Sequence, residues 1–139
     1  MKLVLKDNRR YIIRFDKGEE LFSELVKFCE TEGVVAGPFT AIGASDGVLL
    51  SFYHGHEKKY SDKKVDDELE IAALNGIVAE LDGKLMVHAH GSFSDRNMSL
   101  VGGHVKELLV GSTCEVFLIK LEGNIEREFD EETGLNLMK

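Results

Sequence analysis

Residues 77–90 have the sequence IVAELDGKLMVHAH, and this stretch decides the fold. The segments on both sides of Asp82-Gly83 have the apolar and β-branched composition of strands. An Asp-Gly pair between two such segments is a strong signal for a tight hairpin turn. The sequence therefore predicts two antiparallel strands joined at Asp82-Gly83, the second of which carries His88 and His90.

Other short segments with strand character surround this hairpin. They are residues 11–15, 48–52, 69–71 and 114–121, and a break at Asn75-Gly76 is expected between residues 69–71 and the strand at 77–81. Residues 105–110 are ambiguous, because Val105, Leu108 and Leu109 fit a short helix while the run also fits a strand. The many short strands indicate a chain built mainly of antiparallel β-sheet.

One main helix is predicted over about residues 19–32. Asp16 followed three residues later by Glu19 resembles a capping box, and Gly33 is placed as the C-terminal stop. Between them, apolar residues recur at helical spacing: Leu21, Phe22, Leu25, Val26, Phe28 and Cys29. One helix among many strands predicts an α+β fold, and 139 residues with 43% hydrophobic content predict a single domain over 1–139.

Three histidines form the candidate functional site. Alternate side chains of a strand point to the same face, so His88 and His90 would lie together, about 7 Å apart along the strand. His104 follows the Gly102-Gly103 pair, whose missing side chains allow its backbone to pass close to a neighbouring strand. Three imidazoles would bind a metal ion and leave one tetrahedral position open. The alternative is that these histidines are polar residues hydrogen-bonded to backbone carbonyls.

A second pair, His54 and His56, runs into a charged stretch with a glycine. This pair is therefore interpreted as solvated surface. Lys58, Lys59, Lys63 and Lys64 are mixed with Asp62, Asp66 and Asp67, which favours a solvated edge or loop over a basic patch. With a net charge of −8, the chain is predicted not to bind DNA by itself, because phosphate backbones repel it.

Cys29 and Cys114 each lie among apolar neighbours, which predicts small core residues rather than a redox pair. The first residues, MKLVLKDNRR, do not resemble a signal peptide. No apolar run approaches the roughly 20 residues that a membrane helix needs. A cytoplasmic protein without a membrane segment is expected.

An ordered set of motifs resembles the plants and prokaryotes conserved (PPC) domain family, over essentially the whole chain. The motifs are Asp16-Lys17-Gly18-Glu19-Glu20-Leu21, Ala41-Ile42-Gly43-Ala44, His88-Ala89-His90, Gly102-Gly103-His104 and Phe129-Asp130-Glu131-Glu132-Thr133-Gly134-Leu135. The resemblance implies an α+β fold and a homotrimer. It also implies a divalent metal such as zinc on His88, His90 and His104, as in prokaryotic members.

Plant members of the family carry AT-hook motifs and bind AT-rich DNA, and this chain departs from them. It has no Arg-Gly-Arg-Pro hook, and residues 67–72 only partly match the plant Gly-Arg-Phe-Glu-Ile-Leu motif. It also carries the histidine triplet that plant members generally lack. The resemblance therefore gives little support to a DNA-binding role for this chain.

Three functions follow from these observations. The first is a trimeric binding and regulatory module, in which the open position of the metal takes a small anion or metabolite. The second is a metal-dependent enzyme of hydrolase or lyase type, for which Asp95, Arg96 and Glu107 are the nearest acid–base candidates in sequence. The third is a DNA-associated regulator, by family analogy alone.

Overall fold

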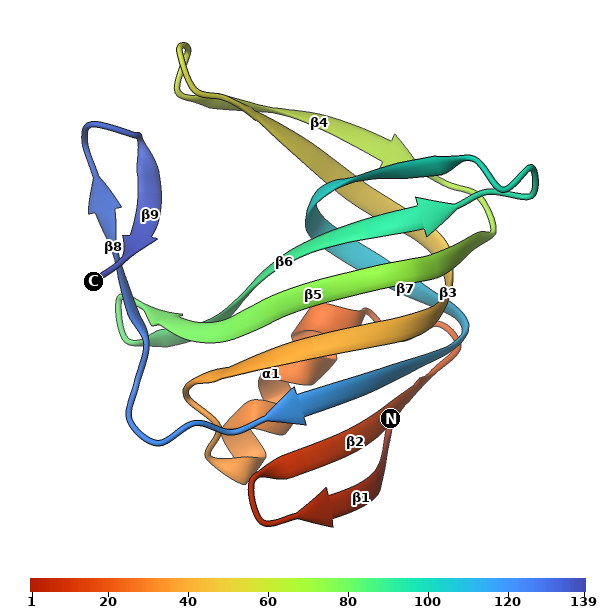
Figure 1. The fold of residues 1–139 in the computed structure, drawn as a ribbon, viewed down its shortest axis with the longest axis horizontal. Coiled ribbons are helices and arrows are strands. Elements are labelled where there is room, and N and C mark those ends of the chain that lie inside the picture. The colour runs from red at the N-terminus through yellow and green to blue at the C-terminus, as the bar shows by residue number, and fades with distance from the viewer.

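The computed structural model describes residues 1–139, and nine strands and one helix follow each other along the chain (Figure 1). Their bounds are β1 Lys2–Asp7, β2 Arg10–Asp16, α1 Leu21–Glu32, β3 Gly37–His54, β4 Lys59–Val65, β5 Leu69–Leu81, β6 Lys84–Ser94, β7 Leu100–Ile119, β8 Glu126–Asp130 and β9 Leu135–Met138. A mostly antiparallel sheet with a single helix confirms the predicted fold class. No helix is long and apolar enough to cross a membrane.

In the part of the sheet that carries the histidines, four strands pair in a closed cycle. β3 pairs with β5, β5 with β6, β6 with β7, and β7 again with β3. β4 extends β3 at an exposed edge, and β8 joins β5 through a short parallel pairing. The β8–β9 hairpin stands apart from the helix, at the far end of β5 and β6 (Figure 1).

The helix covers one face of the sheet with the side chains that the helical periodicity predicted. Leu21, Phe22, Leu25, Phe28 and Cys29 are its buried residues, and they belong to a core cluster of 25 buried residues. Gly33 ends the helix in the left-handed conformation, with φ 63°, as expected for a C-terminal glycine. Alternating residues of β2 and β7 complete this core from the sheet.

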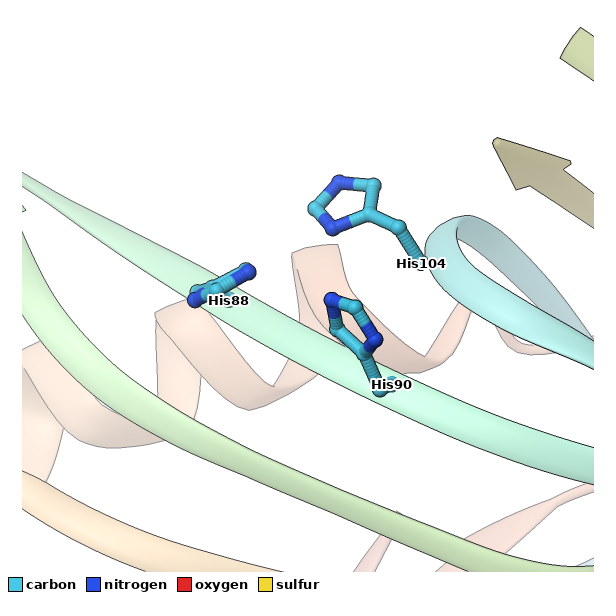
Figure 2. A group of neighbouring side chains, drawn as sticks. All are labelled: His88, His90 and His104. Atoms are coloured by element: carbon cyan, nitrogen blue, oxygen red, sulfur yellow. The ribbon is translucent and has the colours of Figure 1, made fainter. Parts of the chain in front are cut away.

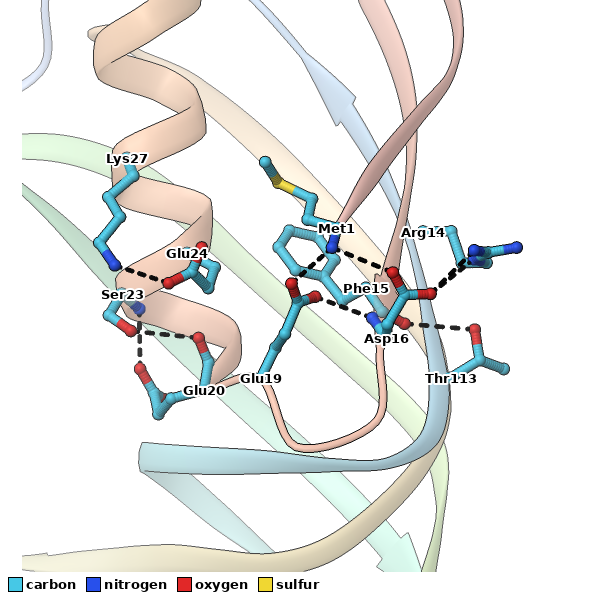
Figure 3. A network of polar contacts seen from close by, with 10 residues as sticks. All are labelled: Met1, Arg14, Phe15, Asp16, Glu19, Glu20, Ser23, Glu24, Lys27 and Thr113. Carbon is cyan, nitrogen blue, oxygen red and sulfur yellow. Dashed lines mark hydrogen bonds and ion pairs between the residues drawn. The ribbon is translucent and has the colours of Figure 1, made fainter.

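The helix begins two residues later than the predicted residue 19, and its N-cap is not Asp16. Glu20 is the N-cap, and its carboxylate accepts a hydrogen bond from the backbone N–H of Phe22. It also accepts from the backbone N–H of Ser23 (Figure 3). The Glu19 carboxylate instead accepts from the backbone N–H of Asp16. The Met1 amino group donates to the carboxylates of both Asp16 and Glu19. The Asp16–Glu19 pair thus closes the turn before the helix.

Two strand expectations are settled by long-range packing. The break expected at Asn75-Gly76 is wrong, because β5 runs without interruption through both residues. Gly76 lies under the Phe39 ring, where an added Cβ would be 2.4 Å from ring carbons. Residues 105–110 are strand throughout, as part of β7.

Candidate metal centre

Two neighbouring strands bring the three histidines together, as Figure 2 shows. His88 and His90 alternate on β6 and share a face, and His104 lies on β7. The register of β6 and β7 places His104 directly opposite His90. The convergence expected from the strand pattern is therefore present, because the sheet pairs these particular residues.

The spacing of the rings suits a shared ion. One potential ligand atom from each histidine lies within 4.8 Å of those of the other two. The ring centroids are 5.3 Å apart for His88 and His90, 5.2 Å for His88 and His104, and 5.3 Å for His90 and His104. Tetrahedral zinc with bonds of about 2.0–2.1 Å holds its nitrogens roughly 3.4 Å apart, so nitrogens separated by up to 4.8 Å would move closer together to share such an ion.

Gly102 allows this close approach of β7 to β6. A Cβ at Gly102 would lie 2.4 Å from the backbone oxygen of Gly91 and 3.1 Å from the Cα of Ser92. Both neighbours are backbone atoms of β6, so they cannot rotate away. The glycine pair before His104 thus has the structural role that the sequence predicted for it.

The surroundings favour the neutral form of two of the rings. Burial lowers the pKa of His88 most, and together with the positive Arg127 and the two other imidazoles it brings this pKa to about 4. Burial also lowers the pKa of His104, followed by the effects of His90 and Lys106. Neutral imidazole is the form that binds a metal, so neither ring needs to lose a proton near pH 7.

Arg127 is a site residue that sequence reasoning missed. It lies on β8, and its Nη2 is 2.9 Å from Nδ1 of His88. A cavity of about 300 Å³ opens beside this contact, between the histidines and the β8–β9 hairpin. The sequence gives no signal for it, because β8 follows His88 by nearly forty residues and joins the sheet through only two paired positions.

The other candidate residues lie elsewhere. His54 ends β3 and its Nε2 is 2.9 Å from the Ser61 hydroxyl, while His56 is exposed in the next turn. Cys29 and Cys114 are buried and unpaired, and burial raises the pKa of each thiol to about 12. These cysteines are core residues, as expected.

The acid–base candidates near the histidines in sequence do not line the cavity beside them. The Asp95 carboxylate accepts hydrogen bonds from the backbone N–H of Asn97 and Ser99, which shapes the turn between β6 and β7. Arg96 extends toward Asp67, at 3.5 Å. Glu107 is an exposed residue of β7.

Several solved structures share this fold. A metal-containing protein from Archaeoglobus fulgidus is 33% identical with a TM-score of 0.90, and the match covers 100% of this chain and 99% of that one. A plant- and prokaryote-conserved (PPC) protein from Pyrococcus horikoshii is 30% identical with a TM-score of 0.89, covering 100% and 97%. A candidate DNA-binding protein from Bacteroides thetaiotaomicron is 24% identical with a TM-score of 0.93, covering 97% and 94%; this likeness shows the fold alone.

No curated protein matches the chain. The model of one family, described as the Plants and Prokaryotes Conserved (PCC) domain, matches residues 4–122, which include α1, β3 to β7 and all three histidines. The match agrees with the resemblance seen in the motifs and with the shared fold. The chain belongs to the Plants and Prokaryotes Conserved domain family.

Proposed function

We propose that this chain is a binding and regulatory module that holds one divalent metal ion, zinc by its ligand chemistry, through His88, His90 and His104. The observation that carries the proposal is the convergence of the three imidazoles within 4.8 Å on one sheet face. Three imidazole ligands leave a fourth tetrahedral position open, which a small anion or metabolite would take. The description of the Archaeoglobus relative as metal-containing adds support.

Elemental analysis tests the proposal directly. The purified chain, dialysed against zinc and then against metal-free buffer, is expected to retain one zinc ion per chain. His88→Ala, His90→Ala and His104→Ala are each expected to retain much less than one ion, because two remaining ligands bind zinc weakly. His56→Ala removes an exposed histidine away from the cluster and is the matched control. Equal zinc content in all four variants would contradict the assignment.

A metal-dependent hydrolase or lyase is the alternative that shares this ligand set. An open position on zinc also serves catalysis, because zinc lowers the pKa of bound water to about 7. Such chemistry usually needs a positioned acid or base. Asp95, Arg96 and Glu107 do not line the cavity, so none of these three supplies that acid or base.

We further propose that the chain forms a homotrimer in the cytoplasm. The sheet face opposite the helix exposes apolar side chains on three adjacent strands: Ile12 is 38% exposed, Ile42 57% and Phe117 39%. Ile12 and Phe117 are direct cross-strand partners, so they form a continuous patch. A patch of this kind on a small domain is typical of an interface.

Light scattering is expected to give the mass of three chains at micromolar concentration. Ile42→Asp places a charge in the patch and is expected to shift the mass toward one chain, because a buried unpaired carboxylate is strongly unfavourable. A monomer mass for the unchanged chain across the micromolar range would refute the proposal.

We expect no appreciable binding to duplex DNA at physiological salt. Two lysines of the β3–β4 edge are neutralised locally, since Lys59 pairs with Glu57 and Lys64 with Asp66. A chain charge of −8 gives 3 × −8 = −24 for a trimer, so repulsion from phosphates grows on assembly. A mobility shift with AT-rich duplex near 150 mM salt checks this. Micromolar or tighter binding would show that this edge acts as a basic patch.

A further inference from the structure

Arg127 brings a permanent positive charge to a site suited to a cation. Its Nη2 donates to Nδ1 of His88 and its Nη1 donates to the backbone oxygen of Asn136, both at 2.9 Å. Its Nε is buried without a hydrogen-bond partner. Because a guanidinium carries five N–H donors and keeps its proton, Arg127 has donor capacity that these two contacts leave unused.

The contact between Arg127 and His88 is incompatible with a metal on His88. Arginine only donates, so Nδ1 of the neutral His88 ring accepts and the ring proton lies on Nε2. A metal on Nδ1 would take the lone pair that Arg127 now uses. A metal on Nε2 would move the ring proton to Nδ1, where it would face an N–H of Arg127. Metal binding through either nitrogen therefore releases the guanidinium from His88.

The released guanidinium would face the cavity of about 300 Å³ beside His88 and His104. Arg127 is the single Lys or Arg among the residues that line this cavity. Four apolar side chains form much of the remaining wall: Met86, Phe129, Leu135 and Leu137. The volume corresponds to that of about ten water molecules, which suits a small organic molecule.

The charges and the walls together indicate the chemistry of the ligand. A metal dication and a guanidinium repel each other across this cavity unless an anion lies between them. A planar carboxylate matches the guanidinium fork with two hydrogen bonds, and the apolar walls suit the carbon chain of an organic acid. Inorganic phosphate would leave the apolar walls without a partner.

We propose that Arg127 and the metal at the three histidines together bind a small organic acid. The guanidinium holds the carboxylate, the open metal position takes an oxygen of the ligand, and the apolar walls contact its carbon chain. The inference rests on the proposed metal site and adds a ligand class to it. Arg127 lies outside residues 4–122, the part of the chain that matches the family model.

The proposal predicts coupling between metal and acid. The metal frees Arg127 and supplies a second anchor, so the loaded chain should bind the acid more tightly than the metal-free chain. Linkage requires the acid to increase metal affinity by the same factor.

Isothermal titration calorimetry with lactate as the probe tests this on the zinc-loaded chain, dialysed free of excess zinc. Arg127→Met is expected to weaken lactate binding by about 10- to 100-fold, the contribution of charge-assisted hydrogen bonds. In the absence of lactate, the same variant should bind zinc about 2- to 10-fold more tightly, because His88 no longer loses a hydrogen bond. Misfolding of the variant would weaken both lactate binding and zinc binding. Weaker lactate binding together with tighter zinc binding therefore identifies the proposed role of Arg127.

Two further variants sharpen the result. Arg96→Met removes the same charge from an exposed position paired with Asp67, and it should leave both affinities unchanged. Arg127→Lys keeps the charge without the fork, and its lactate affinity should lie between those of Arg127→Met and the unchanged chain.

Any one of three results would overturn the proposal. The first is a lactate affinity of Arg127→Met within twofold of that of the unchanged chain. The second is an equal lactate affinity of the metal-free and zinc-loaded chains, and the third is tighter binding of inorganic phosphate than of lactate. Zinc content is measured on the same samples. A chain that holds zinc at the histidines but does not bind lactate refutes this inference alone. A chain that holds no zinc refutes the proposed function and this inference with it.

Discussion

Zinc is expected to raise the melting temperature of the metal-free chain by about 12–16 °C when its free concentration is about 1,000 times the dissociation constant. A ligand that binds only the folded state stabilises it by mass action, by about 4 kcal/mol at this ratio. For a chain of 139 residues, each kcal/mol shifts the melting temperature by about 3–4 °C. Differential scanning calorimetry across a zinc titration measures the shift.

The His88→Ala variant is expected to lose most of this increase at the same zinc concentrations. It keeps two of the three histidines, so zinc binding to the folded chain should weaken enough to leave little mass-action stabilisation. His56→Ala, which changes an exposed turn residue, should keep the full increase. An increase of equal size in His88→Ala, or none in the unchanged chain, would contradict the three-histidine site.

Local chemistry explains the parts of the fold that the sequence predicted correctly. Asp82 and Gly83 both have positive φ, 51° and 73°, which is the conformation that an Asp-Gly hairpin turn requires. Gly33 ends the helix for the same reason. In each case the residues that set the geometry are adjacent in the chain, so a short window of sequence contains the signal.

Residues 105–110 were ambiguous because of an irregularity in strand pairing. Leu49 pairs with Glu107 and the next residue, Leu50, pairs with Val105, so Lys106 is an extra residue in β7. The bulge places Val105 and Leu108 on the buried side at a spacing of three, which is also a helical spacing. The pattern of buried residues follows from the register between β7 and β3. The sequence of residues 105–110 alone does not reveal that register.

Long-range contacts explain the two errors in the predicted secondary structure, which are the start of the helix and the break in β5. Glu20 caps the helix while also accepting from the backbone N–H of Leu108 on β7, so the position of the cap depends on a strand 88 residues away. Gly76 looks like a strand break, yet it is required because the Phe39 ring covers it. In the metal site, the alternation of side chains along a strand predicted that His88 and His90 share a face. Arg127 could not be predicted in this way, because it lies on the β8–β9 hairpin and no local sequence pattern shows that this hairpin packs beside His88.

The position of His104 could be predicted only in part from the sequence. The Gly102-Gly103 pair indicated a close backbone approach, but the pairing of His104 with His90 depends on the register of β6 and β7. Gly102 connects the two observations, because its backbone passes within reach of Gly91 in the strand that carries the other two histidines. Substitution of Gly102 therefore tests the fold and the site together.

Gly102→Ala is expected to destabilise the metal-free chain by about 3 kcal/mol, the upper range for overpacking. The new Cβ would lie 2.4 Å from the Gly91 oxygen, so β6 and β7 must separate locally. Urea unfolding followed by circular dichroism measures the change in the free energy of unfolding. Gly55→Ala is the matched control: its Cβ would meet nothing within 4 Å, and its stability should change by less than about 1 kcal/mol.

The same separation of strands should weaken zinc binding, because it moves His104 away from the two histidines of β6. Gly55→Ala should bind zinc as the unchanged chain does. A Gly102→Ala chain with unchanged stability would show that β6 and β7 are not held as closely as the structure places them. A Gly102→Ala chain that is destabilised yet binds zinc with unchanged affinity would show that His104 does not depend on this approach. The expected result is loss of both, because one backbone contact sets the strand spacing and the geometry of the three imidazoles.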